Sequence, residues 1–137
     1  MVFRPPLWDS PATHGLFDPH TSTLFAVDAL GALLPEPAAE MEEVSEAAFA
    51  EGFHTLARAL SPWLHFVDQG RFDHSLARIR ELAPRVILSS HGPVVRGRTE
   101  ELLTALSRVP AMEPFVGPDQ GEMLAILGEM RAQKKAA

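Results

Sequence analysis

Three side chains that can bind metals or transfer protons lie at the ends of predicted strands. Asp28 follows the apolar run in "LFAVDALGA", His91 follows the run in "RVILSSHGPV", and Asp9 lies in "LWDSP". Loops at strand ends commonly gather into binding and catalytic sites. Carboxylate and imidazole groups are ligands for zinc and iron, and both act as general acids or bases. The three positions are therefore the first candidates for a functional site.

Each of these residues also has a purely structural interpretation. Asp28 can cap the turn that follows its strand, and Asp9 can form an Asx-type turn with Ser10. His91 can pack on a tight turn stiffened by the Gly-Pro pair that follows it. Taken singly, the residues predict a domain with a possible cluster of acidic and imidazole groups, and they do not specify a reaction.

The elements that must position these residues alternate between strands and helices. The hydrophobic pattern predicts a hairpin with strands at 15–17 and 23–27, a strand at 85–89, and a long helix interrupted near Pro62. Thr99 is a plausible cap for the third helix, and Pro118 with Asp119 starts the fourth. About three strands is a thin sheet for four helices. The fold class is therefore α/β, with helices layered on a sheet that lacks some of its strands. The predicted helices are 42–67, 72–83, 99–109 and 117–133.

Composition limits the classes of partner. The chain has 137 residues, 46% of them apolar, with a net charge of −6 and no cysteine. This length suits one domain, and the negative charge argues against a nucleic-acid partner. Without cysteine there is no disulfide and no thiolate ligand, and no apolar run is long enough to span a membrane. We expect a cytoplasmic protein with no membrane partner.

The motifs "LFAVDALGA" and "ILSSHGPV" place Asp28 and His91 63 positions apart (91 − 28). At this spacing the two motifs together resemble the second half of a metallo-β-lactamase-fold domain. The resemblance is to the flavodiiron and oxygen-binding di-iron branch, and it extends from about Phe3 to Ile126. It implies that residues 1–137 form a single partial metallo-β-lactamase-like domain, about one half of an αββα sandwich, with a frayed tail at 132–137. The N-terminal half that bears most of the ligands would be absent.

Carried over by position, the resemblance makes Asp28 a carboxylate that bridges two metals and His91 a terminal ligand. Ser89 and Ser90 would donate hydrogen bonds around these ligands. The complete family site holds two iron or zinc ions. The position of the family's third histidine is occupied here by Asp9, a possible substitute ligand, or by Pro6 or Trp8 if the loop length differs. The family's main His-rich motif is missing, so we expect the chain alone to be inactive, and its own metal content, down to none, is left open.

Several functions remain open at this point. The first is the C-terminal portion of a dinuclear oxygen-binding protein or oxidoreductase, and its alternative is a metal-dependent hydrolase of the same superfamily. Another possible function is that of a non-enzymatic interaction domain that keeps the scaffold. Its partner would be the missing N-terminal half, or a second copy bound through an open sheet edge. A compact mononuclear site from Asp9, Asp28, His91 and a nearby histidine such as His14 is the last. The remaining histidines are expected at helix rims or in solvent: His20, His54, His65 and His74.

Overall fold

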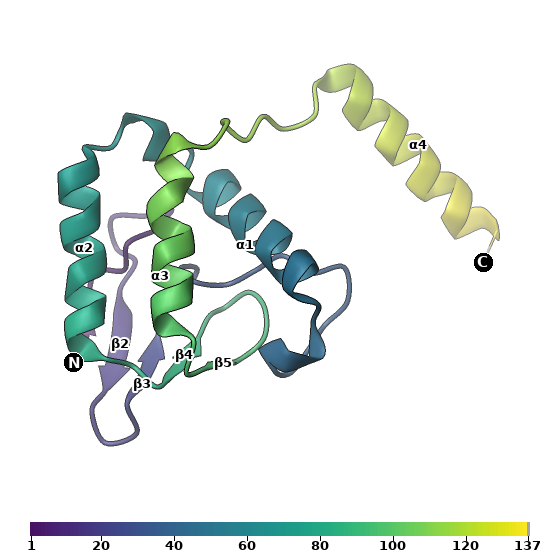
Figure 1. The fold of residues 1–137 in the computed structure, drawn as a ribbon. Coiled ribbons are helices and arrows are strands. Elements are labelled where there is room, and N and C mark those ends of the chain that lie inside the picture. Colours follow the sequence, from purple (N-terminus) through teal and green to yellow (C-terminus); the bar gives the residue numbers. More distant parts are fainter. Residues whose placement is uncertain (137) are drawn as a thin grey trace.

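The computed structural model describes residues 1–136, and its centre is one five-stranded mixed sheet. The strands lie side by side in chain order (Figure 1). β3 and β4 are parallel, whereas every other neighbouring pair is antiparallel. The crossover between the two parallel strands contains α1 and α2. The strands are β1 Val2–Phe3, β2 Gly15–Asp18, β3 Thr23–Phe25, β4 Val86–Leu88 and β5 Val95–Arg96.

α1 and α2 each begin at a side chain that caps the helix. The Ser45 hydroxyl accepts a hydrogen bond from the Ala48 amide, and the Asp68 carboxylate accepts one from the Arg71 amide. Such caps satisfy amides that have no partner inside the helix. The predicted long helix ends before Pro62 and continues as a separate 3₁₀ turn over Pro62–Phe66. The helices are α1 Glu46–Leu60, α2 Gln69–Leu82, α3 Thr99–Arg108 and α4 Gln120–Ala136.

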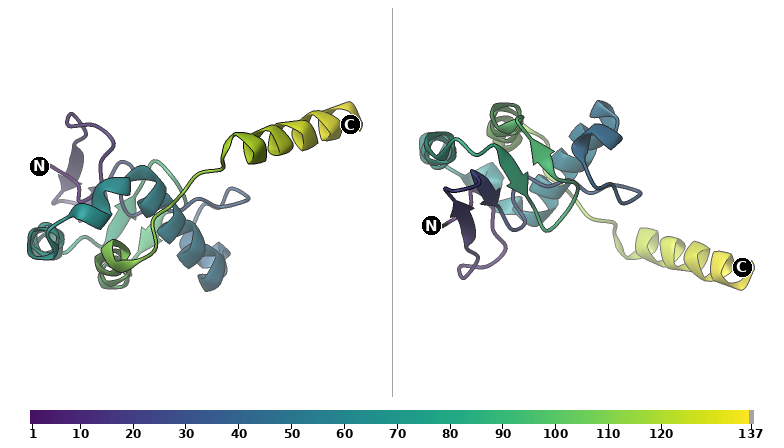
Figure 2. Two further views of the ribbon diagram at one scale, coloured as in Figure 1. Left: turned by 90° about the horizontal axis from the view of Figure 1, so that it is seen from above. Right: turned by 90° about the horizontal axis from the view of Figure 1, so that it is seen from below.

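One face of the sheet carries the hydrophobic core. Phe17, Leu24, Ile87 and Val95 lie opposite one another in register, and all are buried. They face the buried residues of α1, α2 and α3, and Figure 2 shows α2 and α3 together on one side of the sheet. Because side chains alternate across a strand, the residues between them point to the other face.

The second face carries a row of exposed apolar side chains. Val2 pairs with Leu16, Leu16 with Phe25, and Phe25 with Leu88. Val2, Leu16 and Phe25 are 65%, 50% and 41% exposed. Leu88, at the end of the row, is half-buried. We call these four residues the open-face row. No described helix covers them, so the helices bury only one side of the sheet.

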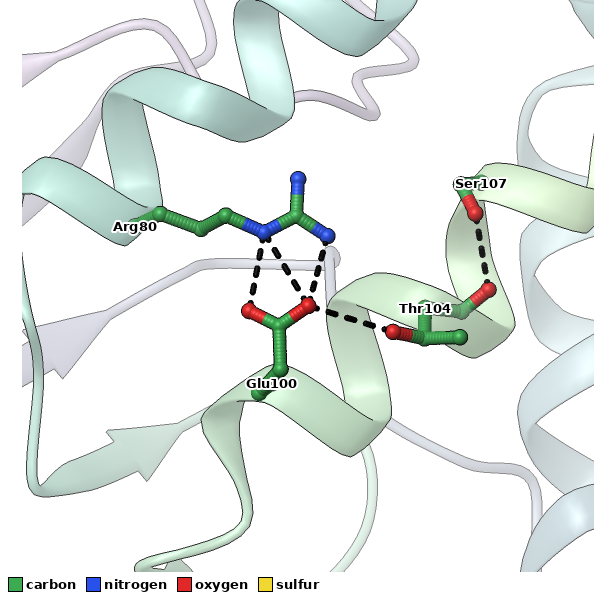
Figure 3. Close-up of polar contacts among 4 residues, drawn as sticks. All are labelled: Arg80, Glu100, Thr104 and Ser107. Carbon is green, nitrogen blue, oxygen red and sulfur yellow. Dashed lines mark hydrogen bonds and ion pairs between the residues drawn. The ribbon is translucent and has the colours of Figure 1, made fainter.

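An ion pair joins α2 to α3. The Arg80 guanidinium donates to both carboxylate oxygens of Glu100, with a shortest distance of 2.8 Å (Figure 3). Thr104 donates its hydroxyl to the same carboxylate. Hydrogen bonds from Arg80, followed by its charge, lower the pKa of Glu100. The pair therefore links the two helices at the solvent-exposed surface.

α4 stands apart from the rest of the chain in every view (Figure 1, Figure 2). Asp119 and Glu122 each accept a hydrogen bond from the other's amide, which forms a capping box. Every described side chain from 113 to 134 is exposed. The helix continues through Ala136 into the segment expected to fray, and residue 137 lies outside the described residues. Over residues 1–136, no helix has the length and hydropathy needed to cross a bilayer.

The expectation of an αββα metallo-β-lactamase sandwich is wrong. The described chain has a single small sheet with helices on one face, and no second sheet faces it. β1 and β5, which the sequence analysis missed, complete five strands. The hydrophobic pattern correctly predicted an α/β chain, but short strand motifs report local conformation and do not determine how layers stack.

Candidate metal-binding pair

Asp28 and His91 lie together beyond the ends of the neighbouring strands β3 and β4. β3 and β4 are parallel neighbours, so the loops after them emerge side by side. The Asp28 carboxylate oxygen Oδ1 lies 3.3 Å from Nε2 of His91. The side chain of Asp28 is 16% exposed and that of His91 is 45% exposed, which leaves the imidazole accessible from solvent.

Backbone contacts hold the two loops against each other. The Val27 carbonyl accepts hydrogen bonds from the Ser90 amide at 2.6 Å and the Ser89 hydroxyl at 2.8 Å. The His91 carbonyl accepts one from the Ala32 amide at 3.1 Å. Ser89 and Ser90 therefore position the loops through the backbone of Val27, and neither donates to the Asp28 carboxylate.

The turn that carries Asp28 has a strained backbone. Val27 has a φ of 56° and Leu30 a φ of 61°, in the left-handed region that side chains disfavour. A β-branched residue in this region costs about 1–3 kcal/mol and persists only where its surroundings fix the conformation. The hydrogen bonds to the Val27 carbonyl do so here. This conformation turns the chain out of β3 and directs Asp28 toward His91.

Gly31 makes the close approach of the loops possible. A Cβ atom at this position would overlap the His91 carbonyl oxygen and the Ser89 side chain. Gly92, with a φ of +97°, lies against the backbone of Ala32 in the same way. The sequence analysis did not identify Gly31 or Val27 as part of the site. The glycine in "DALGA" was the available signal for Gly31.

A shallow cavity of about 420 Å³ opens beside the imidazole. It is lined by Ser90, His91 and Gly92 on one side and by the Pro-rich segment 32–38 on the other. A small molecule can therefore reach the exposed edge of His91 from solvent. The Asp28–His91 pair combines a largely buried carboxylate with an accessible imidazole, which suits both metal binding and proton transfer.

The other predicted ligands do not join this pair. Asp9 is exposed and accepts a hydrogen bond from the Thr13 hydroxyl, whereas the local side-chain turn is made by Ser10, whose hydroxyl accepts from the Ala12 amide. His14 is exposed and contacts the Ala12 carbonyl through Nδ1. Within residues 1–136, no group of three His, Asp, Glu or Cys side chains is arranged to hold a metal ion. The compact mononuclear site is therefore not assembled.

The remaining histidines lie away from the Asp28–His91 pair and differ in burial. Burial, followed by the charges of Arg58 and Arg108, lowers the pKa of His54 on α1. His65 is half-buried, and its Nε2 has no hydrogen-bond partner among the described residues. His20 and His74 are exposed, as expected.

Comparison with known proteins gives a fold and no family. No family model and no curated protein matches the sequence. A solved structure described as a peroxy diiron species of chemotaxis sensor ODP matches with a TM-score of 0.51 and 20% identity. The match covers 77% of this chain and 41% of that one. The apo state of chemotaxis sensor ODP from T. denticola matches with a TM-score of 0.48 and 20% identity, covering 84% of this chain and 43% of that one.

The match with a TM-score of 0.51 corrects the resemblance drawn from the sequence. The chain shares its fold with part of a chemotaxis sensor and spans about two fifths of that structure's length. The assignment to metallo-β-lactamase-fold proteins is wrong, and so are the flavodiiron, oxidoreductase, hydrolase and retained-scaffold interpretations that depended on it. Its basis was two turns, an Asp after a strand and a Ser-His-Gly-Pro segment. Such turns restrict the local backbone and leave the overall fold open.

Proposed function

We propose that this chain forms part of an iron site in a cytoplasmic sensor domain, with Asp28 and His91 as two of the ligands. One observation carries the proposal. Two ligands at about 2.1 Å from one ion, in tetrahedral or octahedral coordination, are about 3.0–3.4 Å apart. Oδ1 of Asp28 and Nε2 of His91 are 3.3 Å apart. The fold match to a diiron sensor favours iron as the metal.

The loops around the pair support a binding role. Strain at Val27 and the close approach at Gly31 fix the two donor atoms before any ion arrives. A fixed arrangement of ligands lowers the cost of binding. When bound, iron supplies redox-active coordination chemistry, while the chain's own residues orient the donors and leave one side open to solvent.

Two protein ligands do not complete an iron site. We propose that the other ligands come from a segment that packs on the open-face row, either the remainder of a larger domain or a second copy. Phe25 and Leu88 of this row are the last residues of β3 and β4. A segment that covers them would therefore lie beside Asp28 and His91, three residues further along each strand.

Paramagnetic broadening in NMR spectra tests the ligand assignment even where affinity is low. Anaerobic addition of Fe(II) to the ¹⁵N-labelled chain should first broaden the amides of residues 28–32 and 89–92. The Asp28→Asn and His91→Gln variants should lose this effect. Asp9→Asn and His14→Gln are matched controls that should keep it.

Two results would contradict the proposal. One is broadening that survives in both Asp28→Asn and His91→Gln. The other is broadening centred on another acidic surface, such as Glu42 and Glu43. In either case the short distance reflects only an imidazole that interacts with a carboxylate. Sedimentation of the same samples tests whether two copies share an ion, because a metal-dependent dimer would then form.

A further inference from the structure

A second cavity lies between the N-terminal segment and α2, away from the residues of the iron site. It has a volume of about 360 Å³, within the range of pockets that hold small molecules. One long face of α2 lines it, at positions 71, 74, 75, 78, 81 and 82. These positions recur every three or four residues, so they share one side of the helix. The opposite wall is the segment from Met1 to Trp8.

Three arginines surround this cavity in a chain of net charge −6: Arg4, Arg71 and Arg78. Glu81 also lines the cavity, but the three guanidinium charges outnumber its one negative charge. The net formal charge of the lining is therefore positive even when His74 is neutral. None of the three forms an ion pair with any residue in the described part of the chain. By contrast, Arg80, Arg96 and Arg98 are each bound to carboxylates elsewhere on the surface.

Apolar side chains form much of the remaining wall, together with the polar His74 and Ser75. Phe3, Pro5 and Leu82 line the cavity, and Pro5 is fully buried beneath it. Trp8 also lines it, with the Arg4 guanidinium 5.5 Å from its ring centroid. Trp8 in turn packs on Trp63 with ring centroids 4.7 Å apart. The cavity thus places a hydrophobic wall beside guanidinium groups.

We propose that this cavity binds a small amphipathic anion, with its apolar body against Phe3, Leu82 and Trp8 and its acidic head at Arg71 and Arg78. Guanidinium groups bind carboxylates and phosphates through paired, charge-assisted hydrogen bonds. The open apolar wall favours a ligand with a hydrocarbon or aromatic body over a bare inorganic anion. The site shares no residue with the Asp28–His91 pair, so it does not depend on the proposed iron site.

Tryptophan fluorescence of the full chain provides the test, because Trp8 lines the cavity. The probes are decanoate and decyl phosphate below their critical micelle concentrations, with 1-decanol as the neutral control and inorganic phosphate as the control without an apolar body. We expect a saturable change with at least one of the two anionic amphiphiles. The tighter of the two identifies the acidic head as carboxylate or phosphate.

The variants test the role of charge. Arg71→Gln combined with Arg78→Gln should weaken binding about tenfold or more, as expected for loss of charge-assisted hydrogen bonds. Arg131→Gln makes the same change on exposed α4 and should bind like the unaltered chain. All substituted positions are exposed, and circular dichroism checks that the fold is retained. The proposal is overturned if 1-decanol binds as tightly as the anions, if inorganic phosphate alone matches decyl phosphate, if the double variant binds normally, or if no probe gives a saturable change.

Discussion

Replacing Gly31 by alanine tests whether close packing of two loops holds the Asp28–His91 pair. Gly31 is buried, and its missing Cβ would overlap the His91 carbonyl oxygen and the Ser89 side chain. One obstacle is backbone, so no side-chain rotation relieves it, and the loops must separate. Overpacking of this kind typically costs about 1–3 kcal/mol. Alanine also raises the free energy of unfolding by about 0.5–1 kcal/mol, because it restricts the unfolded chain more than glycine does. The expected net loss of unfolding free energy is therefore about 0–2.5 kcal/mol.

The assay is urea unfolding followed by circular dichroism, with the free energy of unfolding taken by linear extrapolation. Gly128→Ala is the matched control, because Gly128 lies in exposed α4 and nothing lies near the added methyl. A glycine-to-alanine change inside an exposed helix favours the helix by about 0.5–1 kcal/mol. Because α4 stands apart from the rest of the chain (Figure 1), this gain stays within α4, and Gly128→Ala should leave the unfolding free energy of the remaining chain unchanged. Gly31→Ala, the same chemical change, should lower it.

The same variant should disturb the ligand pair. Separation of the loops moves His91 away from Asp28, so the Fe(II)-dependent broadening at residues 28–32 should fall in Gly31→Ala and remain in Gly128→Ala. An unfolding free energy of Gly31→Ala above that of the unaltered chain, with normal broadening, would refute the reasoning. It would mean that the loops are loose enough to accept a methyl group.

Two further changes test the scaffold. Glu100→Gln should lower the free energy of unfolding at pH 7, and this loss should shrink as the pH falls below about 4.5. Arg80 lowers the folded-state pKa of this carboxyl, so protonation removes the stabilisation that the pair provides. Urea unfolding across pH 3–7 checks this, and a difference independent of pH contradicts it. Removal of residues 118–137 should leave the urea midpoint of the remaining chain unchanged, because every described side chain of that segment is exposed; a clear drop in the midpoint would show that α4 packs on the body in solution.

Much of the scaffold could be predicted from local signals. Pro62 ended the first long helix where the sequence indicated, because its ring clashes with the preceding turn. The hairpin was correctly expected, with strands at 15–17 and 23–27 predicted and strands at 15–18 and 23–25 observed, since β-forming residues flank a turn-rich segment. Thr99 was wrongly taken as a cap. Its hydroxyl donates to the Pro84 carbonyl, and Arg98 occupies the cap position without a side-chain bond.

The missed features involve contacts between distant parts of the chain. β1 and β5 have two residues each, too few to show any periodicity. The strand expected over 23–27 ends at Phe25, because Val27 adopts a left-handed conformation that its side chain disfavours. That conformation is held by Ser89 and Ser90, more than sixty positions away. Local propensity therefore predicts the wrong geometry at the residue that directs Asp28 toward His91.

Docking of a partner at an open sheet edge remains a prediction, and the structure adds a second surface for such docking. An open sheet edge was the predicted docking surface, but both edge strands have only two residues, which limits pairing with another strand. Arg96 of the β5 edge is bound to Glu40. One exposed apolar area lies on a face of the sheet, along Val2, Leu16 and Phe25. A segment that packs on this face both buries the row and reaches the Asp28–His91 pair. Assembly and completion of the iron site would then be one event, so metal affinity and self-association should be lost together when Leu16 and Phe25 are replaced by polar residues.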